Sequence, residues 1–403
     1  MSTKTVPMPG LEVPAATGPR AGLGSVTCAA VLTDSPFGMS AAGAADATLE
    51  IRDQALAALD GGDPRAALVL TGDALTTLAA AGLSGGPDEA AVLVARAEIE
   101  EALDRFEAAA ATAADAITLL GGDAGPGSRD CDCLQLWCQA QERLAGLERL
   151  AGDYAAAAAR LTMLLDTASA ALGEASHAVA AAANALGVVY KDAGDFDAAE
   201  AAYERAMAAA GRLEDTAPLT QAGLLHNLGG LTHSRGDAAA GIPLAERGLA
   251  LRAGALGTAH PDVARDDNAL GALYHLAGRY ADAGLAYTRA LAVFEECYGP
   301  DHFEVAMTCA NLAVLYADRG LFPAAESAGR RALQILETVL GPGDAEVGLT
   351  LLNLATAVAS QGQRAEAVTL AARAEAIMAA GLPAGHPHRA IARAALERLR
   401  RQS

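Results

Sequence analysis

The chain repeats itself with a fixed period of 42 residues, and this repetition restricts the fold more than any other feature of the sequence. Two series of identical residues keep that step across successive repeats: Leu144, Leu186, Leu228, Leu270, Leu312 and Leu354, and Gly152, Gly194, Gly236, Gly278, Gly320 and Gly362. Further upstream, Gly62 and Asp104 are again 42 residues apart at the matching turn. A chain with such a period is expected to fold as an array of like units, each stabilised by its neighbours.

Each repeat has the pattern of two helices joined by a tight turn. In one example, Leu186, Val189 and Tyr190 fall on one face of a helix that Gly194 can end in the left-handed conformation. Asp195 can then cap a second helix, in which small residues recur at three- and four-residue spacing. Neither helix can bury its apolar face alone, so we expect neighbouring repeats to stack.

The turns between repeats carry a second signature. A glycine that can stop one helix is followed by a residue that can start the next, and these starting residues are also 42 residues apart: His260, His302, Asp344 and His386. We expect the three histidines of this series to fix turns rather than to perform chemistry.

The composition favours an all-α fold. Hydrophobic residues make up 52% of the chain but aromatic residues only 4%, and alanine supplies much of the difference. Alanine is the strongest helix former and lets helices approach closely.

The charge and the cysteines limit the classes of function. A formal net charge of −20 argues against a nucleic-acid binder and favours a partner with basic segments. No uninterrupted apolar run approaches the length of about 18 residues that a membrane span needs, and the first residues lack the apolar core of a signal peptide. The six cysteines show no disulfide-like spacing, so we expect a cytoplasmic protein.

Two repeats carry a motif that resembles the tetratricopeptide repeat. Leu186-Gly187-x-x-Tyr190 is followed by Ala199-x-x-x-Tyr203-x-x-Ala206, and the residues 42 positions later match equally well, from Leu270-Gly271 to Ala290. The period and the inter-repeat turns resemble the longer variant found in kinesin light chains. The period alone would also admit HEAT or armadillo repeats, but the motif residues decide against them.

The resemblance covers residues 140–382 well and residues 50–125 more weakly. Ala183 and Leu225 stand where the family often has Trp. Gly241 and Gly248 stand where Ala is usual, which bears on how tightly that repeat packs and not on the fold.

The resemblance implies a right-handed superhelical solenoid of about eight helix-turn-helix repeats, with the first helix of each repeat on the concave side. We expect a disordered tail over residues 1–45, the repeat array over 46–385 and a cap helix over 386–403.

The resemblance also implies where a partner binds. In this family a peptide usually lies in the concave groove, against side chains of the first helices. The corresponding residues here are Asn184, Lys191, His226, Asn227, His233, Arg265, Asn268, His275, Asn311 and Asn353. Asn is not a favoured residue inside a helix, but its carboxamide suits a peptide backbone of any sequence. The alternative is that these Asn side chains tie one helix to the next.

Sharper hypotheses find less support in the sequence. Capture of a C-terminal carboxylate needs paired cations on neighbouring first helices, whereas Lys191 and Arg265 are two repeats apart and next to acids. His226, His233 and His275 could approach one another, but histidines held by hydrogen bonds are commoner than metal ligands. The cysteines of one further cluster fit no zinc spacing and are expected to be plain thiols: Cys131, Cys133 and Cys138.

No catalytic motif is present, because the sequence lacks a phosphate-binding glycine loop, a His-Glu-x-x-His segment and a nucleophile elbow. We therefore predict a scaffold or adaptor that binds a protein or peptide partner in its groove, with no enzyme activity, no cofactor and no metal, and with neither nucleic acid nor membrane as partner. The alternative is a regulatory module that changes its superhelical pitch when it binds a peptide. A metalloprotein or an enzyme with an unfamiliar site ranks below both.

Overall fold

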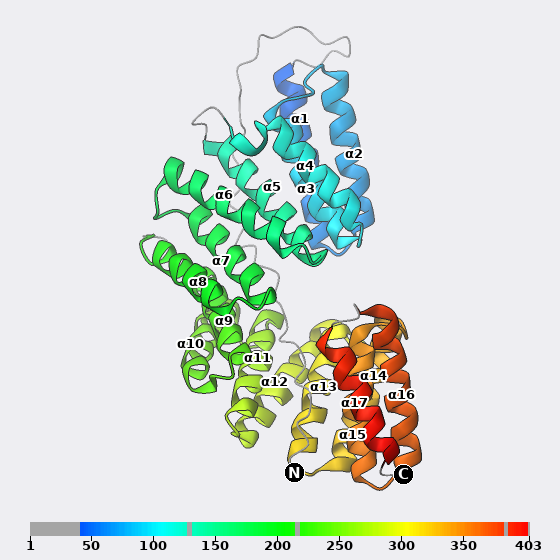
Figure 1. Cartoon of the computed structure of the whole chain (residues 1–403). Helices are drawn as coiled ribbons and strands as arrows, with labels where there is room; N and C mark the ends of the chain where they lie inside the picture. Colours follow the sequence, from blue (N-terminus) through cyan, green and yellow to red (C-terminus); the bar gives the residue numbers. More distant parts are fainter. Residues whose placement is uncertain (1–40, 127–130, 214–217, 383–385, 402–403) are drawn as a thin grey trace. The chain divides into compact units, whose positions relative to one another are not determined.

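A computed structural model describes residues 41–126, 131–213, 218–382 and 386–401 of the chain (Figure 1). All regular secondary structure within these ranges is helical, which confirms the predicted all-α repeat solenoid. The predicted tail lies outside the described residues up to residue 40. The first helix begins at Ala41, so residues 41–45 are helical.

The described residues form two units, which we treat separately. The unit that ends at residue 217, here the first unit, holds four helix pairs: α1 (Ala41–Asp60) and α2 (Pro64–Ala80), α3 (Pro87–Ala102) and α4 (Phe106–Leu119), α5 (Cys131–Leu150) and α6 (Tyr154–Leu172), and α7 (His177–Asp192) and α8 (Phe196–Ala210). A short 3₁₀ helix, Gly122–Ala124, follows α4.

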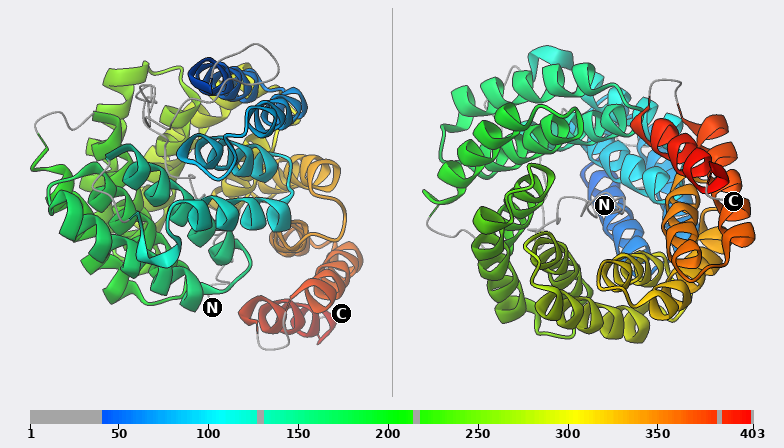
Figure 2. Two further views of the ribbon diagram at one scale, coloured as in Figure 1. Left: turned by 90° about the horizontal axis from the view of Figure 1, so that it is seen from above. Right: turned by 60° about the horizontal axis from the view of Figure 1, so that its bottom comes forward.

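The second unit begins at Pro218 and holds four more pairs and a last helix: α9 (Pro218–Ser234) and α10 (Ala238–Leu256), α11 (Pro261–Leu276) and α12 (Tyr280–Tyr298), α13 (Phe303–Asp318) and α14 (Phe322–Val339), α15 (Ala345–Ser360) and α16 (Arg364–Gly381), and α17 (Pro387–Arg401). Within this unit successive pairs stack side by side (Figure 2). The last helix packs on α16 and α15, in the place that the first helix of a further repeat would take.

The turns inside the pairs use the residues that the sequence indicates. The six glycines of the series from Gly152 to Gly362 all have positive φ, between 72° and 85°. Asp104, at the matching turn upstream, adopts φ 57° without being glycine. The aspartates that follow three of these glycines cap the second helices, as when Asp195 accepts a hydrogen bond from the backbone N–H of Ala198 at 3.1 Å.

The turns between repeats are fixed as predicted. The Nδ1 atoms of His260, His302 and His386 each accept a hydrogen bond from a backbone N–H two residues later, at 3.1–3.2 Å. Asp344 does the same with a carboxylate oxygen, toward Glu346 N–H at 2.8 Å. These four side chains therefore cap first helices.

Close packing inside each pair depends on matched side-chain sizes. Gly271 of α11 lies against the ring of Tyr287 on α12, and Gly187 of α7 lies against Tyr203 in the same way. A methyl group on Gly271 would lie 2.7 Å from two ring carbons of Tyr287, which is 1% exposed. In the repeat before, a methyl group on Gly229 would lie at ordinary contact distance from its neighbours, 3.6 Å from Cβ of Ala245 and 3.8 Å from Cδ1 of Leu273. The motif glycine is therefore required where its neighbour is a tyrosine.

The two glycines that depart from the motif are also sites of close approach. A methyl group on Gly241 would overlap the side chain of Thr232 and lie 2.7 Å from Leu273. A methyl group on Gly248 would lie 3.2 Å from Cβ of Leu225. The repeat over α9 and α10 thus packs closely because these positions lack side chains.

Two glutamates in the same place of consecutive repeats have different surroundings. Glu304, at the start of α13, accepts a hydrogen bond at 2.8 Å from Nε of Arg265 on α11. For Glu346, 42 residues later at the start of α15, the place of that arginine is taken by buried Met307. The Oε2 atom of Glu346 is buried and has no hydrogen-bond partner among the described residues. Burial, with a smaller contribution from Asp344, raises the pKa of Glu346 to about 7.

The contact between Gly271 and Tyr287 gives a matched pair of substitutions. Gly271→Ala should destabilise the protein by about 1–3 kcal/mol, because the new methyl group overlaps a rigid buried ring. Gly229→Ala should leave stability unchanged or raise it by up to about 1 kcal/mol, since alanine is the better helix former and finds room. Urea unfolding followed by circular dichroism measures both. Equal effects of the two substitutions would contradict the size-matching argument.

The raised pKa of Glu346 predicts a pH-dependent effect. The folded protein holds this proton more tightly than the unfolded chain does. The protonated group therefore contributes to the free energy of unfolding below about pH 4.5, and this contribution is lost as the pH rises through about 7. Glu346→Gln should therefore stabilise the protein at pH 8, by about 1–3 kcal/mol, and have little effect near pH 4.5.

Glu304→Gln is the matched control for that experiment. It should destabilise the protein at pH 8 by about 1–3 kcal/mol, because the charge-assisted bond to Arg265 is lost. Unfolding curves for both variants at the two pH values test the pair. Destabilisation by Glu346→Gln at pH 8 would mean that its carboxylate has a favourable partner.

Candidate functional site

The first helices of successive pairs contact one another within each unit, and we call the side that they form the first-helix face. All ten residues predicted to bind a peptide lie on first helices. Asn184 and Lys191 are on α7 of the first unit. The other eight are on α9, α11, α13 and α15 of the second unit: His226, Asn227, His233, Arg265, Asn268, His275, Asn311 and Asn353.

Two of the predicted asparagines bind each other. Nδ2 of Asn311 on α13 donates a hydrogen bond to Oδ1 of Asn268 on α11 at 3.2 Å. The two residues are 43 positions apart, one more than the repeat, so they occupy neighbouring and not identical places on their helices. Asn268 is 2% exposed and Asn311 is half-buried. This contact is the helix-to-helix tie that the sequence left open as an alternative.

The same offset of 43 residues joins other polar pairs on first helices. Nε2 of His275 on α11 lies 2.9 Å from a carboxylate oxygen of Asp318 on α13. In the first unit, Nη1 of Arg149 on α5 donates to Asp192 on α7 at 2.7 Å, and Nζ of Lys191 lies 3.8 Å from the same carboxylate. Polar side chains thus cross-link consecutive first helices in both units.

These pairings bear on the carboxylate-capture hypothesis. Arg265 binds Glu304 and Asp262, and Lys191 lies next to Asp192. The two cations also belong to different units. The arrangement therefore gives no support to a two-cation clamp built on Lys191 and Arg265.

His226 belongs to a buried ionic network that sequence reasoning missed. Its Nδ1 atom lies 2.8 Å from one oxygen of Asp266 on α11, and the other oxygen accepts a hydrogen bond at 2.7 Å from Nε of Arg252 on α10. All three residues are at most 8% exposed. The sequence does contain a sign that Arg252 is buried, because Arg252 occupies the same place in its repeat as Phe294 and Leu336, which are buried and apolar. The network joins α9, α10 and α11, and burial of such charges is costly unless each is paired.

The remaining predicted residues differ in burial. Asn184, Asn227 and His233 are half-buried. Asn353 on α15 is 9% exposed, and its Nδ2 atom is buried with no hydrogen-bond partner among the described residues. A buried amide donor without a partner is costly and marks a place where a ligand acceptor would be favourable.

Glu142 on α5 is another residue that the sequence did not single out. It occupies the register of Asn184, His226 and Asn268, and burial raises its pKa to about 7, although neighbouring Arg143 opposes the shift. Burial, and then the charge of Glu142, raises the pKa of the Cys138 thiol to about 12. A glutamate inside a helical pattern is usually solvated, so the sequence pattern gives no signal that this one is buried.

The cysteines of the described residues differ in burial. Cys133, Cys138 and Cys309 are buried. Cys297, near the end of α12, is exposed. The side chain of Cys131 lies outside the described part of the structure. Among the residues that are described, no group of three or more potential ligands could hold a metal ion.

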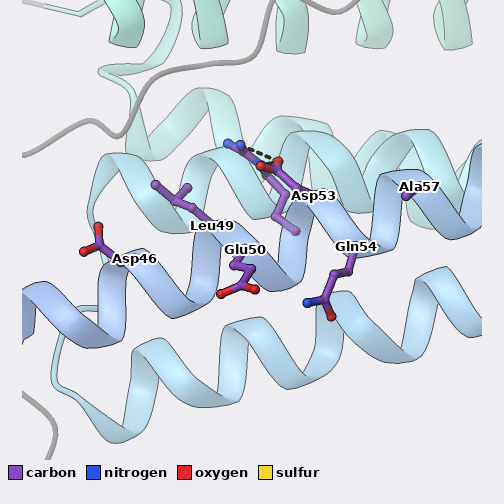
Figure 3. A pocket seen from close by; sticks show the side chains of 7 residues that line it. Asp46, Leu49, Glu50, Asp53, Gln54 and Ala57 are labelled. Atoms are coloured by element: carbon purple, nitrogen blue, oxygen red, sulfur yellow. Dashed lines mark hydrogen bonds and ion pairs between the residues drawn. The ribbon is translucent and has the colours of Figure 1, made fainter.

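A shallow hollow of about 460 Å³ lies along α1 (Figure 3). All seven lining residues come from this one helix, and Arg52 among them is bonded to the neighbouring Asp53. Binding sites usually combine polar groups from several elements, so this hollow is not a candidate. None of the described helices has the length and apolar character that a membrane span requires.

Several solved structures are similar to this chain. The apo form of RapI aligns over 73% of this chain and 98% of its own, with 10% identity and a TM-score of 0.54. BtubC (BKLC) from P. vanneervenii aligns over 57% of this chain and 93% of its own, with 23% identity and a TM-score of 0.48. A putative kinesin light chain with TPR-like repeats from Podosopora anserina aligns over 49% and 94%, with 22% identity and a TM-score of 0.41.

The likeness to RapI shows that the fold is shared. No curated protein matches the sequence. The sequence model of the tetratricopeptide repeat, in contrast, matches residues 138–211, 220–296, 267–338 and 304–380, which together span more than half of the chain. This chain therefore belongs to the tetratricopeptide repeat family.

Proposed function

We propose that this protein is an adaptor that binds an extended segment of a partner protein along the first-helix face of its second unit. The observation that carries the proposal is the presence of a carboxamide on each of the four first helices of that unit: Asn227, Asn311 and Asn353 as candidate contacts, and Asn268, which is 2% exposed, as the partner that holds Asn311. A carboxamide has both donors and acceptors, so it can bind a peptide backbone whatever its sequence.

The internal pairing of the face supports this proposal by keeping its helices in place. Asn268 and Asn311 bind each other, and His275 binds Asp318. A peptide would then meet side chains held in fixed positions, and little conformational entropy would be lost on binding. The buried Nδ2 atom of Asn353 would be the donor that gains most from a backbone carbonyl of the partner.

The proposal includes no catalytic step. Several charged groups on this face are engaged in ion pairs, as Arg265 is with Glu304 and Asp266 with Arg252. A role in binding is the general function of the family. We infer a cytoplasmic location, where thiols stay reduced, because the six cysteines show no disulfide-like spacing in the sequence.

Substitution of three asparagines tests the proposal. The triple variant Asn227→Ala, Asn268→Ala and Asn311→Ala should lose its partner in an affinity pull-down read by mass spectrometry. Melting should change little, because both members of the Asn268–Asn311 hydrogen bond are removed together and neither is left unpaired. The partner identified with the intact protein is then titrated against both purified proteins by calorimetry, and we expect at least about tenfold weaker binding.

A second triple variant controls for general effects of substitution. Arg247→Ala, Thr288→Ala and Gln334→Ala change exposed residues on the second helices α10, α12 and α14. This variant should keep the partner. Retention of the partner by both triple variants would overturn the proposed site, and collapse of melting in the asparagine variant alone would assign those residues to stability.

A further inference from the structure

A groove on the second unit lies apart from the first-helix face. It runs between the second helices α10 and α12, has α11 as its floor and has a volume of about 640 Å³. Its α11 residues run from Val263 to Tyr274, which corresponds to a length of about 16 Å at the rise of an α-helix. Most of the lining is aliphatic: Leu249, Ala250 and Ala253 from α10, Val263 and Leu270 from α11, and Ala292 from α12.

Two carboxylates and one guanidinium group lie among these aliphatic residues. Asp267, on the floor, accepts a hydrogen bond at 3.1 Å from Nε of Arg289 on α12. At one end, the hydroxyl group of Tyr274 donates to Oε1 of Glu246 on α10 at 2.7 Å. The lining therefore carries one more negative than positive charge.

Asp267 departs from the pattern of the repeats. The residues in the same register are uncharged and buried: Ala183, Leu225, Cys309 and Leu351. The Asp267 side chain is 10% exposed, whereas that of its cation Arg289 is 55% exposed at the mouth of the groove. A charge in a core position contributes little to stability even when paired. Such a local exception in a repeated fold is expected where a protein binds something.

The next two pairs of second helices show why the groove is open here. Arg331 on α14 reaches back to Glu295 on α12 at 2.6 Å, and Arg373 on α16 reaches back to Glu337 on α14 at 2.5 Å. Arg289 has the register of these two arginines, but the place of the glutamate on α10 is taken by Ala253. Arg289 pairs with Asp267 on α11 instead, so no ion pair of this kind joins α10 and α12 at this place.

We propose that this groove binds a basic peptide segment that places an aliphatic side chain between α10 and α12 and a lysine or arginine beside Glu246 and Asp267. The aliphatic walls fit the aliphatic side chain of the peptide, and the excess of carboxylates fits its lysine or arginine. The net charge of −20 on the whole chain also favours a basic ligand. This site is independent of the partner proposed for the first-helix face.

Methyl NMR on the full chain tests the site. The probe is the acetylated and amidated pentapeptide Lys-Leu-Ala-Leu-Lys, titrated into protein labelled at Ala, Leu and Val methyl groups. We expect saturable shifts of the methyl signals of Leu249, Val263 and Leu270, and weaker binding as salt is added. A peptide with Glu in place of both Lys residues should bind at least about tenfold more weakly.

Matched variants locate the binding. Ala250→Trp fills the groove from an exposed position and should weaken binding by at least about tenfold, whereas Gln334→Trp, in the same register on α14, should have no effect. Glu246→Gln should weaken binding about threefold or more, because a carboxylate near the cation is lost.

Three results would overturn the proposal: unchanged binding to the Ala250→Trp variant, equal binding of the acidic peptide, or no saturable shift of the groove methyl groups. Shifts confined to methyl groups of the first helices would also overturn it, and would place basic peptides on the other face. The asparagine triple variant should still bind the probe, so the failure of one proposed site is distinguishable from the failure of the other.

Discussion

The structure depends on the contact between the two helices of each pair, where the size of one side chain sets the size of its neighbour. Tyr287 can lie flat on α11 only because residue 271 is glycine. In the next repeat the two places are taken by Ala313 on the first helix and Gly329 on the second, and a methyl group on Gly329 would lie 3.8 Å from Cβ of Ala313. Close contact of the two helices is thus kept while the residues change. Stacking of the pairs, and with it the first-helix face, requires that this contact be made in each repeat.

Contacts between repeats follow a slightly different spacing from the repeat itself. Side chains in equivalent places are 42 residues apart, but the polar pairs that join consecutive first helices are 43 residues apart, as in Asn268–Asn311 and His275–Asp318. One residue turns a side chain by about 100° around an α-helix. A residue therefore pairs with the residue that follows its own equivalent in the next repeat. Identical repeats would not by themselves produce these pairs.

This difference explains how far the sequence could predict the structure. The helix pairs, the glycine turns and the capping role of His260, His302 and His386 depend on local chemistry, and all of these expectations are confirmed. The bond between Asn268 and Asn311 depends on the rotation of one helix against another, which periodicity does not reveal. The burial of Arg252 with Asp266 likewise required the packing of three helices to be known. The sequence therefore located the candidate face but not how its side chains are engaged.

Charged and polar side chains bridge consecutive repeats on both faces of the second unit, with one exception. On the first-helix face, Arg265 and His275 reach from one repeat to the next and hold the helices in place. On the other side, Arg331 and Arg373 do the same for the second helices, but Arg289 does not, because alanine replaces its glutamate. Each bridge between repeats contributes to the stability of a regular array. Stability therefore does not explain why one bridge is missing, or why the carboxylate of Asp267 is buried at the same place. Two independent departures that line the same groove are better explained by a ligand than by chance variation of the repeat.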